Sequence, residues 1–395
     1  MSKINVSVIN FAELLPYKKA LESLSPANQV GNLNASLLYS KDKNSLTLYV
    51  SDSTALAFVN IEATIEAEDI SDDFGFYIDY RKFFDIIQSY KPEVRSTISM
   101  ELALGPSSLK LFTSIDKLSL PHLEMNLDQV LEVQNSPLME PPADFDFSLS
   151  QFEDRKDFLT GLTNCLKFIA TTDKKNNALA LYSDRLVVND RRHIFIYNFE
   201  TPIVLPTQPV SIHKLSAKIL GALSRDTIEY FITQDMKRAI IQDKFATFVL
   251  NNSMSNIMPP SEEDLDSIRS QTQAFNMPTT QLAEIAGFFN QFYSSDMEQE
   301  PITLDIKDNA LTFLLKDSGV VGYNSCNVER KAEAVIHPKE ASTSTIINSS
   351  LRSFISLIPD DVNIDIFIDD STPAVYLHTA KRKIYLAKLG WRRKE

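Results

Sequence analysis

The residues best suited to chemistry in this sequence are lysines and arginines that recur on predicted helices. Their side chains suit contacts to the phosphates of a polyanion, which are independent of sequence and weaken with salt. Acidic residues gather instead in predicted loops and linkers, so a chain with a net charge of −13 can still present a positive face. For any one of them taken alone, an ordinary solvated helix face is the alternative. The candidates for phosphate contact are Lys18, Lys19, Arg81, Lys82, Arg155, Lys156, Lys167, Lys214, Lys218 and Arg352.

The sequence lacks the usual signatures of catalysis and of metal binding. Its nine glycines form no glycine-rich phosphate loop, and none of its five histidines is spaced as His-x-x-x-His. Acidic pairs such as Asp144 with Asp146, or Asp369 with Asp370, fall in strand or turn contexts that solvation explains. We therefore expect no catalytic residue, no metal and no cofactor, and a nuclease is the least favoured function.

The composition is that of a globular chain long enough for several domains. Of its 395 residues, 44% are hydrophobic and 23% are charged, so each domain can bury a core. Cys165 and Cys326 make no disulfide framework and are expected to be reduced, buried apolar residues. The first residues lack the apolar core of a signal peptide, and no apolar run approaches the roughly 18 residues of a membrane span. These features predict a soluble, cytoplasmic protein.

A short segment returns along the chain and predicts three repeats. NSLTLYVSDS at Asn44–Ser53 returns as NALTFLLKDS at Asn309–Ser318. A second phrase, NASLLYS at Asn34–Ser40, returns as NALALYS at Asn177–Ser183. Each copy predicts a β-hairpin, and repetition of this kind decides the architecture of the whole chain.

The predicted hairpins alternate with helices that also repeat. In the first hairpin the apolar residues of 46–51 should face a core, whereas Thr47, Tyr49 and Ser51 should face water. Helices are expected at Phe11–Leu24, Tyr80–Tyr90 and Thr279–Phe292. One helix of each repeat carries an apolar stripe with the same spacing. The three stripes are Phe83, Ile86, Ile87 and Tyr90; Ser216, Ile219, Leu220 and Leu223; and Leu351, Phe354, Ile355 and Ile358.

Two linkers separate the repeats. Val130–Ala143 is rich in proline, and Pro259–Thr272 begins with proline and is acidic. The predicted fold class is therefore α+β, with three tandem domains at residues 1–135, 144–258 and 273–395. Each domain is expected to pack two helices on antiparallel sheets.

This layout resembles the bacterial sliding clamp, the β subunit of DNA polymerase III. The resemblance rests on three repeats of this length, on the helix segment DIIQSY at Asp85–Tyr90 and on a closing strand YLAKL at Tyr385–Leu389. The family's middle-domain signature, Thr-Asp-Gly-His-Arg-Leu, falls at Asn189–Ile194, where only Asp190 is kept. The sequence therefore resembles a remote member of the sliding-clamp family, such as one encoded by a bacteriophage.

The resemblance implies the DNA clamp fold and a function in DNA replication. Two chains would join head to tail as a homodimeric ring around duplex DNA, with sheets outside and helices lining the hole. Such a clamp tethers DNA polymerase without reading sequence, and a clamp-loader ATPase opens it. The resemblance also brings Lys174 and Lys175 close to DNA. The predicted helix Thr279–Phe292 has no basic residue. Either this domain lines the hole with its polar residues Gln281, Asn290 and Gln291, or a different face of the domain faces the hole.

The same resemblance implies a pocket for short apolar peptides where the second and third domains meet. Arg191 stands where the family has glycine, which implies an altered peptide preference. An ordinary exposed strand end is the alternative for Arg191, Arg192 and His193. The implied pocket residues are Asn189, Arg191, Arg192, His193, Ile194, Pro259, Tyr385, Leu386 and Leu389.

Two other functions fit parts of the sequence. A clamp-like factor for viral transcription or packaging would share the repeat layout. A structural β-rich virion protein would explain the hairpins but not the basic helix faces. Retention on circular DNA would mark a clamp, metal-dependent cleavage a nuclease, and sedimentation with particles a virion protein.

Overall fold

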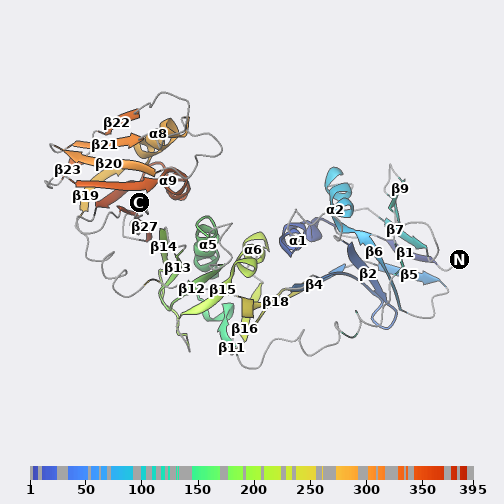
Figure 1. The fold of residues 1–395 in the computed structure, drawn as a ribbon. Helices are drawn as coiled ribbons and strands as arrows, with labels where there is room; N and C mark the ends of the chain where they lie inside the picture. The colour runs from blue at the N-terminus through green and yellow to red at the C-terminus, as the bar shows by residue number, and fades with distance from the viewer. Residues whose placement is uncertain are drawn as a thin grey trace. The chain divides into compact units, whose positions relative to one another are not determined.

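The computed structural model divides the chain into two compact units (Figure 1). The first unit comprises Met1–Leu159 and Leu215–Met254, and the second comprises Thr160–Lys214 and Ser255–Glu395. Both units take residues from the predicted middle domain, so the division into three domains stays a prediction. The structure describes residues 3–7, 11–24, 34–51, 55–61, 64–68, 73–91, 99–103, 109–112, 117–120, 123–124, 130, 132, 145–169, 177–189, 193–205, 209–223, 228–233, 237–254, 260, 273–291, 301–307, 310–315, 328–332, 335–336, 342–368, 375–379 and 383–388.

The first unit holds a five-stranded and a nine-stranded sheet. The five-stranded sheet has the order β5 (Thr64–Glu68), β1 (Lys3–Ser7), β7 (Ser99–Ala103), β8 (Leu109–Phe112) and β9 (Lys117–Leu120). The nine-stranded sheet has the order β10 (Leu123–Glu124), β6 (Phe74–Asp79), β2 (Asn34–Ser40), β3 (Ser45–Ser51), β4 (Ala55–Ile61), β18 (Ala246–Asn251), β17 (Arg238–Gln242), β16 (Glu229–Thr233) and β11 (Phe145–Ser148). Neighbouring strands are antiparallel in both sheets.

The second unit holds a nine-stranded and a four-stranded sheet. The nine-stranded sheet has the order β15 (Val210–His213), β12 (Ala178–Leu181), β13 (Arg185–Asn189), β14 (His193–Asn198), β27 (Ile384–Lys388), β26 (Val375–Thr379), β25 (Asn363–Ile368), β19 (Gln273–Pro278) and β23 (Val335–Ile336). The four-stranded sheet has the order β22 (Val328–Ala332), β21 (Ala310–Leu315), β20 (Pro301–Lys307) and β24 (Ser342–Ile347). These strands too pair antiparallel.

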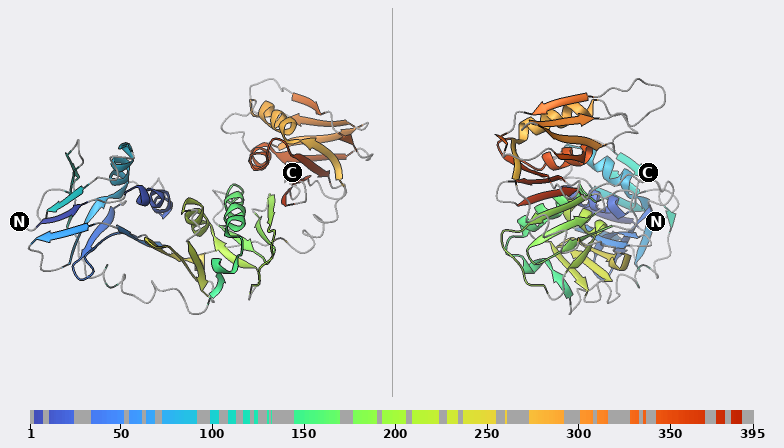
Figure 2. Two further views of the ribbon diagram at one scale, coloured as in Figure 1. Left: turned by 180° about the vertical axis from the view of Figure 1, so that it is seen from behind. Right: turned by 60° about the vertical axis from the view of Figure 1, so that its left-hand side comes forward.

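Two pairs of helices pack together beside these sheets. In the first unit α1 contacts both α2 and β4, and in the second unit α8 contacts α9 (Figures 1 and 2). The expected helix at Phe11–Leu24 is confirmed residue for residue, with Pro16 inside it. The helices are α1 (Phe11–Leu24), α2 (Tyr80–Ser89), α5 (Arg155–Leu166), α6 (Lys214–Leu223), α8 (Thr279–Asn290) and α9 (Asn348–Ile355), with short 3-10 turns η2 (Leu149–Gln151) and η3 (Asn252–Met254).

In each nine-stranded sheet, one strand pair joins segments that are far apart in the sequence. In the first unit β4 pairs with β18, and the Asn60 N–H donates to the Phe245 carbonyl at 2.7 Å. In the second unit β14 pairs with β27, and the Asn198 N–H donates to the Lys383 carbonyl at 2.9 Å. The two bonds are equivalent by position, because 198 − 60 and 383 − 245 both equal 138. The repeat therefore extends to the way in which the sheets are joined.

A side-chain contact supports the first of these joins. The Tyr17 hydroxyl on α1 donates to Asp243, and the ring of Tyr17 is fully buried. The same carboxylate accepts from the backbone N–H groups of Phe245 and Ala246 at 2.8 and 2.9 Å, which closes the turn before β18. One carboxylate thus holds both the helix and the turn that positions β18.

Most of the predicted core pattern is confirmed, with one correction. The stripe of α6 is buried at all four positions, and that of α9 at Leu351, Phe354 and Ile358, with Ile355 half-buried. The expectation that Thr47 faces water is wrong, because this residue is only 3% exposed. Its hydroxyl donates to the Asn60 side chain on β4 at 2.9 Å, and this bond offsets the cost of burial.

Two glycines on helices differ in what surrounds them. A Cβ at Gly161 on α5 would lie 2.5 Å from the Tyr197 ring on β14, closer than real atoms approach. A Cβ at Gly287 on α8 would meet nothing within 4 Å. Gly161 therefore permits close packing of helix on strand, whereas Gly287 has no such role.

We expect opposite effects when each glycine is replaced by alanine. Gly161→Ala should lower the free energy of unfolding by about 1–3 kcal/mol, because the added methyl group overpacks the contact with Tyr197. Gly287→Ala should raise it by up to about 1 kcal/mol, because alanine is the better helix former and the space is open. Urea unfolding followed by circular dichroism measures both. Equal midpoints for the two variants would contradict this account.

Candidate nucleic-acid interface and peptide site

The predicted phosphate-binding residues on α1 and α2 differ in their surroundings. Lys18 lies between the two helices, where its Nζ contacts Asp85 at 2.5 Å and Gln88 at 2.9 Å, and its side chain is only 16% exposed. Lys19 is exposed and makes no ion pair with the described residues. On α2, Arg81 is half-buried, and Lys82 is 69% exposed with Asp79 at 3.6 Å. Lys18 therefore joins the helices, while Lys19 and Lys82 extend into solvent.

A similar division separates the basic residues of the middle segment. Arg155 at the start of α5 donates to the Glu229 carboxylate at 3.0 Å and to the Ile228 carbonyl at 3.3 Å. This guanidinium ties α5 to β16. Lys156 and Lys218 are exposed, and neither pairs with a carboxylate in the part of the chain that the structure describes. In the first unit α6, which carries Lys218, lies on the same side of the nine-stranded sheet as α1 (Figures 1 and 2).

Lys214 borders a half-buried histidine at the start of α6. The Asn177 amide lies 3.2 Å from Nε2 of His213, which ends β15. Burial, and then the charge of Lys214, hold the pKa of His213 below its ordinary value. The neutral imidazole therefore suits the folded state, and Lys214 has a local electrostatic effect besides any contact with phosphate.

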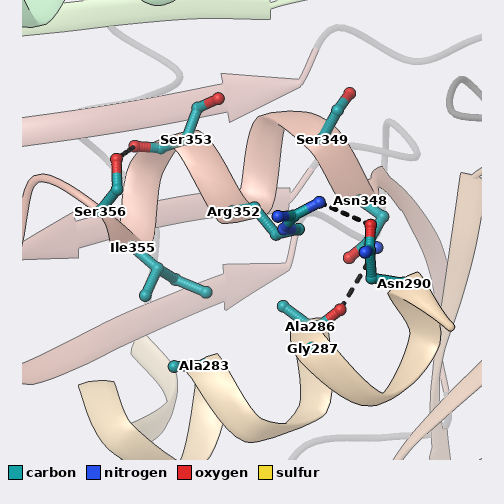
Figure 3. A pocket seen from close by; sticks show the side chains of 10 residues that line it. All are labelled: Ala283, Ala286, Gly287, Asn290, Asn348, Ser349, Arg352, Ser353, Ile355 and Ser356. Carbon is teal, nitrogen blue, oxygen red and sulfur yellow. Dashed lines mark hydrogen bonds between the residues drawn. The ribbon is translucent and has the colours of Figure 1, made fainter.

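In the second unit, the basic residues border a groove between α8 and α9 (Figure 3). Arg352 on α9 is exposed and donates to the Asn290 side chain on α8 at 2.5 Å. Lys167, one residue past the end of α5, donates to the Ser356 hydroxyl at 3.0 Å. The groove has a volume of about 560 Å³. Asn290, proposed from the sequence as a polar substitute for lysine, lies in its wall, whereas Gln281 and Gln291 are not among its lining residues.

Sequence reasoning missed most of the groove. Ser349 and Ser353 line it from α9, and Ser356, the residue after this helix, continues the same spacing. That spacing is visible in the sequence, but serines on a helix commonly face solvent without a function. The opposite wall comes from α8, with Ala286 and Gly287, and its contact with α9 is not visible in the sequence.

The two strands predicted to form the peptide pocket lie side by side. In the second unit, β14 and β27 pair with His193 opposite Lys388 and Ile196 opposite Tyr385. Nε2 of His193 lies 2.7 Å from the Ser350 hydroxyl on α9, and this contact is buried. The structure thus brings the two predicted walls together and fastens one of them to α9.

Most of the predicted pocket side chains that the structure describes belong to the core. Asn189, His193, Ile194 and Leu386 are buried, with at most 7% of any of them exposed, whereas Tyr385 is only partly buried. Tyr385 packs against a cluster formed by Ala180, Tyr182, Val187, Ile194, Ile196, Phe367 and Tyr376. Its ring also meets His378 edge-on, with centroids 4.3 Å apart. Among the described candidates, Tyr385 is therefore the least buried side chain.

Some predicted residues lie outside the described part of the chain. These are Lys174, Lys175, Arg191, Arg192, Pro259, Leu389 and Cys326. Within the described part, Cys165 is buried as expected, and burial raises the pKa of its thiol. The described residues contain no cluster of three or more potential metal ligands. No helix among them is long and apolar enough to cross a membrane.

Comparison with known proteins identifies the architecture. No protein-family model and no curated protein matches the sequence. A DNA polymerase III β subunit from Thermotoga maritima matches with a TM-score of 0.73 and 13% identity, over 99% of this chain and 100% of that chain. One from Pseudomonas aeruginosa matches with a TM-score of 0.69 and 15% identity, over 98% and 100%. This chain has the DNA clamp fold.

A third clamp structure contains a bound peptide. The Helicobacter pylori β clamp bound to a DNA ligase peptide matches with a TM-score of 0.66 and 14% identity, over 99% of both chains. Identities this low establish the clamp fold alone, since one fold can support several functions. The α+β class predicted from the sequence and the clamp fold implied by the resemblance are both confirmed.

The pKa of His213 predicts how stability depends on pH. Because the folded state holds the pKa below about 6.5, the unfolded chain binds the proton more readily. The stabilisation is therefore complete above about pH 6.5 and is lost as the pH falls through the folded pKa. Urea midpoints at a series of pH values should fall over this range for the wild-type protein and fall less for His213→Gln.

Lys214→Gln provides the control for this measurement. Removing the neighbouring charge should reduce the loss of stability but not abolish it, because burial is the larger cause. An unchanged pH dependence in His213→Gln would show that other groups are responsible.

Proposed function

We propose that this chain is a DNA sliding clamp, a processivity factor that encircles duplex DNA and tethers replication proteins. The observation that carries the proposal is the likeness to DNA polymerase III β subunits over nearly the full length of both chains. A likeness confined to one repeat would suit many other functions. No catalytic step belongs to the proposed function.

The basic residues proposed to contact DNA fall into two groups, according to whether they pair with a carboxylate within the chain. Lys19, Lys156 and Lys218 would contact phosphates directly, since they are exposed and pair with no described carboxylate. Lys82 and Arg352 would add to them, whereas Lys18 and Arg155 would chiefly position helices. We propose Arg81, Lys167, Lys174, Lys175 and Lys214 as further members of this set.

Magnitudes favour encirclement over tight contact. Exposed ion pairs contribute about 0.2–1 kcal/mol each and weaken with salt. A few such contacts cannot hold DNA for long at physiological salt. Long retention would therefore require a closed ring, which the proposed function supplies.

The proposed assembly is a head-to-tail homodimer of three-domain chains. The domains would span residues 1–135, 144–258 and 273–395, so that two chains supply six. Heterologous contacts of this kind close into a ring when the rotation permits it. A clamp-loader ATPase would open the ring, and a DNA polymerase would be its main partner.

A peptide pocket on β14 and β27 would bind these partners. The support is the pairing of the two strands in the second unit, together with the peptide-bound clamp from Helicobacter pylori. Tyr385 would provide the accessible apolar surface. Asn189, His193, Ile194 and Leu386 would support it from beneath, and Arg191, Arg192, Pro259 and Leu389 complete the proposed site.

Retention on circular DNA tests the proposed function. The protein, loaded by a clamp loader or by slow spontaneous opening, should stay with nicked circular DNA through gel filtration at high salt. It should be lost when a restriction enzyme makes the circle linear, because a ring can slide off an end. Equal loss from both forms would exclude encirclement.

The native mass serves as the control for this test. Light scattering at micromolar concentration should give twice the chain mass of 44.6 kDa. A strict monomer that fails to stay on circles would contradict the ring.

Replacing the exposed helix lysines should weaken DNA binding without unfolding the protein. The triple variant Lys19→Gln, Lys156→Gln and Lys218→Gln removes three phosphate contacts. The plot of log K against log salt for duplex DNA has a negative slope, and the magnitude of this slope should therefore decrease by about 3. Fluorescence anisotropy at several salt concentrations measures this slope.

A matched triple variant controls for net charge. Lys41, Lys43 and Lys244 are exposed residues of turns rather than helices. Replacing all three with glutamine changes the net charge equally but should leave the salt slope within about 1 of wild type. Equal slopes for the two triple variants would argue against a basic helix face.

A further inference from the structure

One row of paired residues crosses the nine-stranded sheet of the second unit and changes from apolar to polar at Tyr385. Residues that pair directly across neighbouring strands point to the same face of a sheet. This face also carries the apolar cluster against which Tyr385 packs, and we call it the Tyr385 face. From β12 to β19, the row consists of Ala180, Val187, Ile196, Tyr385, His378, Asp365 and Asn276.

The opposite face of the same strands is apolar throughout and belongs to the core. There Phe195 pairs with Leu386, and its ring stacks on Phe168 with centroids 4.2 Å apart. Leu386 pairs in turn with Leu377, and Leu377 with Ile366. All four strand residues are at most 1% exposed. The core therefore accounts for this face, whereas the polar end of the Tyr385 face has no part in it.

Tyr385 is held in place by the next residue of the row. The ring of His378 meets the Tyr385 ring edge-on, with centroids 4.3 Å apart. On its other side His378 stacks on Phe367, also with centroids 4.3 Å apart, and His378 is fully buried. A partly exposed aromatic ring that is fixed from behind is a good centre of binding energy, because little freedom is lost when a partner covers it.

Asp365 places a carboxylate at the polar end of the row. It is half-buried, and the Asn276 side-chain nitrogen donates to its Oδ1 at 2.7 Å. The Asn363 side chain donates to Asn276 Oδ1, also at 2.7 Å. Both partners are neutral amides, so these contacts orient the carboxylate and leave its charge in place. A cation would complement this end of the row.

The spacing of the strands relates the ring to the carboxylate. Neighbouring strands lie about 4.8 Å apart, so Tyr385 and Asp365, two strands apart, are separated by roughly 10 Å. An extended peptide covers this distance in about three residues. The apolar stem of a lysine or arginine could lie on the aromatic rings while its charged end contacts the carboxylate.

We infer that a peptide bound on Tyr385 also places a lysine or arginine on Asp365, about three residues from its apolar anchor. Asp365 is then a specificity-determining residue of the peptide site. The inference rests on the proposed function, because it names the chemistry of the partner segment at the proposed pocket. That segment is both apolar and basic, and an acidic segment is rejected.

Selection from random heptapeptides displayed on phage tests this preference. The full-length wild-type protein and Asp365→Asn are immobilised separately, and the bound peptides are sequenced. Peptides from wild type should combine an aromatic or aliphatic residue with lysine or arginine about three positions away. Those from Asp365→Asn should keep the apolar residue and lose the basic one, because asparagine has nearly the same shape but no charge.

Asp305→Asn provides a matched control. Asp305 is also half-buried, but it lies on β20 in the four-stranded sheet. This variant should select the same peptides as wild type. By fluorescence anisotropy at low salt, the best wild-type peptide should bind Asp365→Asn about fivefold more weakly and Asp305→Asn less than about twofold more weakly. High salt should remove the difference.

The outcomes separate this inference from the proposed function. If Asp365→Asn still selects basic peptides, or if Asp305→Asn loses them equally, the net charge of −13 attracts them and Asp365 does not. Apolar peptides without a basic residue, or binding unaffected by Tyr385→Ala, would also overturn the inference. If wild type enriches no peptide, the proposed pocket itself fails, whereas retention on circular DNA decides separately whether the chain is a clamp.

Discussion

Pairing of strands that are distant in the sequence is the constraint on which the rest of this structure depends. Without β18, the edge of β4 would present a row of unpaired N–H and C=O groups, and β14 would do so without β27. Each pairing continues a short meander into a nine-stranded sheet. The helices are placed by these sheets, and so are the basic residues that the helices carry.

The described lysines and arginines on the helices differ in whether they pair with a carboxylate of the same chain. Lys18 and Arg155 form ion pairs within the fold. Lys18 joins α1 to α2 through Asp85, and Arg155 joins α5 to β16 through Glu229. Lys19, Lys156 and Lys218 have no such partner among the described residues and remain available. An acidic chain can in this way keep a small set of exposed cations, which suits diffuse and reversible contact with a polyanion.

The sequence by itself determined the local elements and their repetition. Alternation predicted the strands and the 3, 4, 7 spacing predicted the helix stripes, since these periods follow from backbone geometry. Resemblance in layout then predicted the clamp fold correctly, although only Asp190 of the signature is kept.

Tertiary structure alone decided which of the described helix cations pair with carboxylates, because the partners of Lys18 and Arg155 lie more than 60 residues away in the chain. It alone buried Thr47 against Asn60, joined β14 to β27 and brought α8 against α9. Spacing along a chain fixes which face a side chain occupies, whereas its partner depends on how distant segments pack.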